Sequence, residues 1–139
     1  MNELTITGNL TDEPTLHDTP GGAAILTLTV AVNDRRFDRG RGQWVDRPAV
    51  FHRVVAFRGL AENAAHLARG TAVTVTGKLA DDSWTPEDSG RKVYRTVLEA
   101  EDIAVSLRFA TAAVTKVRRE QHADDRGGDA EINMASASE

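Results

Sequence analysis

The residues with the clearest chemical potential lie in one segment, from Val50 to Arg58, which has the pattern of a β-strand. Alternate side chains of an extended strand share a face, so Phe51, Arg53 and Phe57 point the same way. Two aromatic rings with a guanidinium between them can stack on flat bases and neutralise phosphate. The same pattern also suits an ordinary sheet core, because aromatic residues are enriched in strands. The segment alone leaves both interpretations open.

The charge of the chain is unevenly distributed, which is more informative than its net value of -4. Between Ala31 and Arg58 there are seven arginines against three aspartates, whereas Glu120 to Glu139 holds six acidic residues against one arginine. Positive charge is therefore concentrated around the aromatic segment. The polar hairpin before that segment supplies further candidate contacts for nucleic acid, which are Arg35, Arg36, Phe37, Arg39 and Arg41.

The composition bounds the class of protein. A chain of 139 residues with 40% hydrophobic content fits one domain with a tail, and the absence of cysteine excludes disulfides and thiolate metal sites. The four histidines lack metal-ligand spacing, and no nucleophile motif or phosphate-cradling glycine loop is present. We therefore expect a binding protein rather than an enzyme, with no metal and no cofactor. The N-terminus has no signal-peptide pattern and no apolar run could span a bilayer, which predicts a cytoplasmic protein with no membrane partner.

The apolar alternation predicts an all-β fold. Strands are expected over residues 4–10, 26–32, 50–58, 72–79 and 93–104, with one helix over residues 60–68 that Gly70 ends. A turn is expected over residues 19–22, a long mobile hairpin over 35–44 and a second hairpin over 85–90. Five strands with a helix between the third and the fourth is the element order of an OB-fold barrel.

The chain divides into three parts by composition. Residues 1–105 hold the predicted barrel, and residues 106–117 keep apolar content as an extension that we expect to pack on something. Residues 118–139 are polar, small and acidic, which predicts a disordered tail.

The segment from Phe51 to Phe57 resembles bacterial single-stranded DNA-binding proteins of the homotetrameric OB-fold type. Further motifs support the resemblance in the same order along the chain, over about residues 2–117. These are Ile6–Leu10, Thr19–Gly22, Leu60–Asn63, Leu67–Thr71, and Gly77–Leu79 followed by Trp84.

The resemblance implies roles for particular residues. Stacking aromatics fall on Phe51, Phe57 and Trp84, and also on Phe37, while Arg53 falls where a phosphate contact is expected. Strand parity places Lys78 on the same face as Trp84, so Lys78 joins the expected DNA contacts. The resemblance also implies a homotetramer, a dimer of dimers, in which residues 106–112 act as a clamp. The expected subunit contacts are Leu4, Ile6, His52, Leu107 and Phe109.

The implied function is sequence-independent binding and protection of single-stranded DNA in replication, recombination or repair. Two rivals use the same barrel: an RNA-binding protein, because stacking platforms accept either sugar, and a structural or interaction module, because a fold does not dictate a function. An enzyme is a third rival, disfavoured by the missing motifs.

Two features depart from the family pattern. Asp81 and Asp82 place negative charge beside Trp84, which should weaken DNA contact. The tail offers neither proline nor phenylalanine near Glu139, so we expect no recruitment of repair and replication enzymes through it. Together the two departures favour a specialised paralogue.

Overall fold

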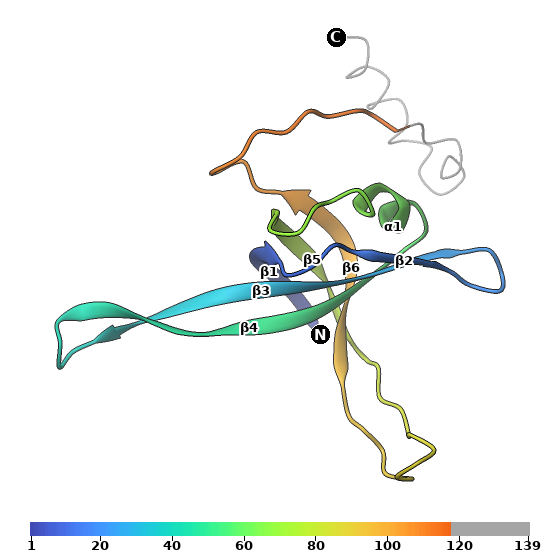
Figure 1. The fold of residues 1–139 in the computed structure, drawn as a ribbon, viewed down its shortest axis with the longest axis horizontal. Coiled ribbons are helices and arrows are strands. Elements are labelled where there is room, and N and C mark those ends of the chain that lie inside the picture. The colour runs from blue at the N-terminus through green and yellow to red at the C-terminus, as the bar shows by residue number, and fades with distance from the viewer. Residues whose placement is uncertain (118–139) are drawn as a thin grey trace.

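The computed structural model of the chain describes residues 1–117, and the predicted acidic tail lies outside the described residues. The described part holds six strands and one helix: β1 (Glu3–Leu10), β2 (Thr15–Asp18), β3 (Ala24–Asp38), β4 (Gln43–Phe57), α1 (Arg58–Ala64), β5 (Ala72–Asp81) and β6 (Thr96–Val105). The sheet order is β1-β5-β6-β4-β3-β2, and β1 also pairs with β3. Five strands thus close into a barrel with the helix between its third and fourth strands, which confirms the predicted OB-fold (Figure 1).

The core lies inside the barrel and is built by alternation. Leu26, Leu28 and Val30 of β3 point inward, as do Val54 and Ala56 of the neighbouring strand β4. These side chains are buried because every second residue of a strand faces the same side of the sheet. Their neighbours on the outward face remain available for contact with other molecules.

Two glycines allow the barrel to close. Gly8 lies where β1 changes partner from β5 to β3, and a Cβ on it would overlap the backbone carbonyl of Ala31. Gly77 lies at a register shift between β5 and β6, where a Cβ would overlap the carbonyl of Glu99. Close backbone approach of this kind requires the absence of a side chain.

Several predicted boundaries were wrong, and one strand was missed. The helix ends at Ala64 rather than Ala68. Gly70, with φ +86°, lies in a later turn, where its N–H donates a hydrogen bond to the carbonyl of Leu10. The last strand begins at Thr96, because Val93 makes only an isolated bridge to Trp84. The short strand β2 was not predicted.

Two arms extend from the barrel (Figure 1). One is the predicted polar hairpin, in which β3 and β4 remain regularly paired out to Asp38 and Gln43. The other connects β5 to β6 and carries Trp84. Both arms therefore hold aromatic side chains away from the core.

Candidate nucleic-acid interface

The outward face of β4 carries the aromatic row. Phe51 is 64% exposed and Phe57 is 44% exposed, and Arg53 between them is also exposed. The inward positions of the same strand hold the fully buried Val54 and Ala56. The rings therefore do not fill the core, and the alternative of an ordinary core strand is wrong.

A bulge brings a further aromatic residue into line with this row. Val32 pairs with Val50 but Asp34 pairs with Arg47, so β4 holds one more residue than β3 in this interval. Directly paired residues share a face. Beyond the bulge Phe37 pairs with Trp44, and their ring centroids lie 5.5 Å apart in an edge-to-face arrangement. The face of Phe51 thus continues along the arm to this pair.

Trp44 was missed as a site residue. Strict alternation along β4 places it on the opposite face from Phe51. The extra β4 residue at the bulge moves it to the same face as Phe51. Its aromatic character in a basic hairpin was the signal available in the sequence.

Two of the arginines predicted as contacts in the arm are held by ion pairs at its surface. Arg35 lies 3.2 Å from Asp46, and Arg41 lies 3.7 Å from Asp38. Such surface pairs are worth about 0–1 kcal/mol, so phosphate could displace the carboxylates at little cost. Arg36 and Arg39 make no ion pair within residues 1–117.

The second arm meets the aromatic row through one carboxylate. Asp82 accepts hydrogen bonds from the Nε of Arg95 at 3.0 Å and from its Nη2 at 2.5 Å. The same carboxylate lies 3.8 Å from the Nε of Arg53 on β4. The guanidinium carbon of Arg95 lies 4.5 Å from the ring centroid of Trp84, which is 44% exposed. Asp82 therefore links Trp84 to the aromatic row.

This contact changes the interpretation of the two aspartates. Asp82 is not a bare repulsive charge beside Trp84, because two arginines already neutralise it. Asp81 serves its own turn: hydrogen bonds from the Ser83 hydroxyl and from the Ser83 backbone N–H lower the pKa of its carboxyl. Arg95 had not been predicted to belong to the site, since only the pairing of the two arm strands reveals it.

Asp82 competes with phosphate for Arg53 and Arg95, which gives a testable consequence. We expect Asp82→Asn to tighten single-strand binding by about 1.5- to 5-fold, since an exposed ion pair contributes about 0.2–1 kcal/mol. The salt dependence should become steeper as the freed arginines take phosphates. Fluorescence titration against a dT oligomer measures both. Asp88→Asn, in the same arm, is the matched control, and weaker binding by Asp82→Asn would contradict the interpretation.

Lys78 lies on the same outward face as the aromatic row, level with Val55 and Glu99 but two strands away from β4. Its ammonium lies 3.8 Å from Glu101, and its paired neighbours on β1 and β6 are Glu3 and Glu99. The acidic surroundings make it the least suited of the predicted contacts for phosphate.

The predicted subunit contacts fall in different environments. Ile6 is 6% exposed within the core of the chain's own barrel, so its apolar character is explained without a partner. Leu4 and His52 are half-buried. Leu107 and Phe109 are exposed on the extension, which has no regular secondary structure over the described residues 106–117.

Within residues 1–117 no group of three or more metal-ligating side chains could hold an ion. No helix in this described part is long and apolar enough to cross a membrane.

Comparisons with known proteins identify the family of the chain. The model of the single-strand binding protein family matches residues 1–106. A single-stranded DNA-binding protein of Mycolicibacterium smegmatis is 47% identical over 119 residues, covering 84% of this chain and 70% of that protein. One from Paenarthrobacter aurescens is 39% identical over 128 residues, covering 90% and 74%.

A solved structure shows the same fold. The crystal structure of a small single-stranded DNA-binding protein from Streptomyces coelicolor superposes with a TM-score of 0.61 at 30% identity, covering 76% of this chain and 94% of that one. The relatives are named as binding proteins and not as enzymes. The chain belongs to the single-strand binding protein family.

Proposed function

We propose that the chain binds single-stranded DNA without sequence preference. The observation that carries this proposal is the exposed row of Phe51, Arg53 and Phe57 on the outward face of β4. Exposed rings are costly to leave in water, and each ring on this face can stack on a base of an extended single strand. The names of the relatives support the same ligand.

The proposed mechanism combines stacking with charge neutralisation. Bases stack on Phe51, Phe57 and Trp84, while Phe37 and Trp44 extend the path along the arm. Every base has a flat face, so this contact tolerates any sequence. Arginines replace counterions on the phosphates, which makes affinity fall steeply as salt rises. One barrel should cover about 4–16 nucleotides.

A comparison of three ligands tests the function directly. We expect binding to poly-dT to exceed binding to duplex DNA of equal charge, because paired bases cannot stack on the rings. Quenching of tryptophan fluorescence measures this, since Trp44 and Trp84 both lie on the proposed path. Poly-U serves as the RNA competitor. Preference for the duplex or indifference to salt would refute the proposal, and equal or tighter binding of poly-U would favour the RNA alternative.

We propose that this binding protects single strands exposed during replication, recombination or repair. Each process opens duplex DNA and leaves strands whose bases are free to stack. The same ligand would bring the protein to the nucleoid.

We also propose a homotetramer, built as a dimer of dimers. The support is the extension, which leaves Leu107, Phe109 and Val114 largely exposed and is anchored at Ser106, whose N–H donates to the carbonyl of Ala72 at 2.9 Å. Exposed apolar side chains favour association, because a second copy that covers them removes their surface from water.

Truncation tests this assembly. Deleting residues 107–139 should weaken the oligomer more than deleting residues 118–139, because only the first removes the apolar extension. Light scattering over a dilution series measures the mass of each variant. A full chain that remains monomeric at all concentrations would refute the assembly.

A further inference from the structure

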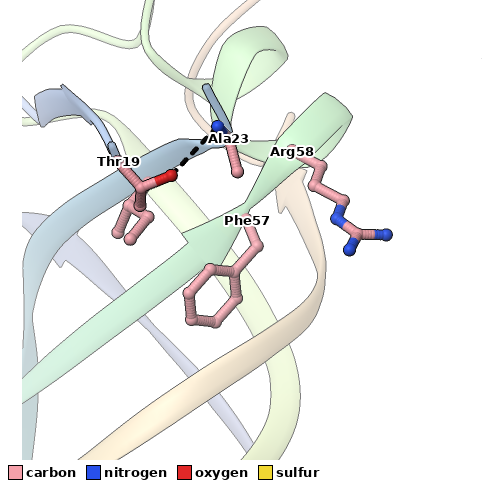
Figure 2. A pocket seen from close by; sticks show the side chains of 5 residues that line it. Thr19, Ala23, Phe57 and Arg58 are labelled. Atoms are coloured by element: carbon pink, nitrogen blue, oxygen red, sulfur yellow. Dashed lines mark hydrogen bonds between the residues drawn. The ribbon is translucent and has the colours of Figure 1, made fainter. Parts of the chain in front are cut away.

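An open pocket lies at the end of β4 that is farther from the basic arm. Its volume is about 510 Å³, and it is lined by Thr19, Ala23, Ile25, Phe57 and Arg58 (Figure 2). The Thr19 hydroxyl accepts a hydrogen bond from the Ala23 N–H at 3.0 Å, which fixes the turn that forms one wall. The pocket is therefore preformed and mainly apolar.

The pocket continues the aromatic row. Ile25 pairs directly with Phe57, so both side chains lie on the outward face of the sheet that also carries Phe51 and Arg53. A DNA strand that passes along β4 from the arm would reach this pocket at Phe57, which forms part of its lining.

Arg58 adds a cation in a strained conformation. Its φ of +58° lies in the left-handed region, and it is the only non-glycine residue there within residues 1–117. Glycine adopts this conformation without cost, whereas a side chain at this position is strained. Strained residues of this kind concentrate at binding sites, where the surrounding structure holds them in place.

The guanidinium of Arg58 is open to a ligand. It makes no ion pair with any residue that the structure describes. Its side chain extends away from the Phe57 ring, as Figure 2 shows. An apolar surface and a cation that lie apart suit a nucleotide, because the sugar holds the base apart from the phosphate. The apolar surface can take the base and the cation the phosphate.

We propose that the nucleotide stacked on Phe57 is held in a subsite at the end of the DNA path, with its base also against Ile25 and its phosphate on Arg58. The inference rests on the proposed single-strand binding and adds a site at its end. An apolar peptide would leave the guanidinium without a counter-charge, so the anionic nucleotide is the better occupant.

Arg58→Gly separates the role of this residue in binding from any role in folding. The variant should keep or raise the melting temperature, because glycine relieves the strained φ. Its affinity for a dT oligomer at about 50 mM salt should fall roughly 5- to 10-fold, and the slope of log affinity against log salt should drop by about 0.7, the loss of one phosphate contact. Arg58→Lys should restore most of the slope.

A matched control removes the same charge elsewhere. Arg69 is exposed on the connection between α1 and β5, so Arg69→Gly should leave affinity and slope nearly unchanged. Equal losses in Arg58→Gly and Arg69→Gly would show a bulk charge effect and overturn the subsite. Unchanged binding by Arg58→Gly, with weakened binding by Phe51→Ala, would overturn the subsite while the proposed function stands. Failure of the unaltered chain to bind dT would refute the function itself.

Discussion

Phe51→Ala should lower the affinity for single-stranded DNA by about 5- to 150-fold, because stacking on one base is worth about 1–3 kcal/mol. The ring is 64% exposed, so its removal opens no cavity in the core. The free energy of unfolding should therefore change little. Phe51→Tyr, which keeps a flat ring, should bind almost as the unaltered chain does. Fluorescence titration with dT and thermal unfolding of the same samples provide the two measurements.

A core variant is the control for this prediction. Leu26 is fully buried on the inward face of β3, next to Ala56 of β4. Leu26→Ala should cost about 2–5 kcal/mol of stability by leaving a cavity. If Phe51→Ala lost as much stability as Leu26→Ala, or if it bound DNA normally, the stacking role would be wrong.

The barrel could be predicted from the sequence because its core follows a simple rule. In β3, Leu26, Leu28 and Val30 alternate with Thr27 and Thr29, and burial follows that alternation without exception. The exposed aromatic face of β4 follows from the same periodicity. Whether that face pointed inward or outward required knowing that Val54 and Ala56 fill the core.

The features that the sequence did not reveal depend on contacts between distant segments. The position of Trp44 depends on a bulge in the pairing of β4 with β3. The neutralisation of Asp82 depends on Arg53 of β4 and on Arg95 across the second arm. The contacts of Asp82 with these two arginines have no periodic signature, because each joins residues at least 13 positions apart in the chain. The left-handed conformation of Arg58 is likewise imposed by the junction between β4 and α1, since glycine is the residue that adopts it without cost.

Gly77→Ala should strongly destabilise the barrel. The added Cβ would overlap the carbonyl oxygen of Glu99 and lie 2.8 Å from its carbonyl carbon. These are backbone atoms of the paired strand β6, so neither can move without breaking the pairing of β5 with β6. We expect a loss of more than about 3 kcal/mol in the free energy of unfolding. Urea unfolding followed by tryptophan fluorescence measures it.

Gly21→Ala is the matched control for this substitution. A Cβ at Gly21 would meet only the Thr19 hydroxyl, at 3.9 Å, and its φ lies outside the left-handed region. Stability should therefore change by no more than about 1 kcal/mol, and a gain is expected because alanine restricts the unfolded chain. A Gly77→Ala barrel that unfolded at the same urea concentration as Gly21→Ala would show that β5 and β6 do not approach as described. Since barrel closure holds the outward face of β4 in place, Gly77→Ala should lose stability and DNA binding together, whereas Phe51→Ala should lose binding alone.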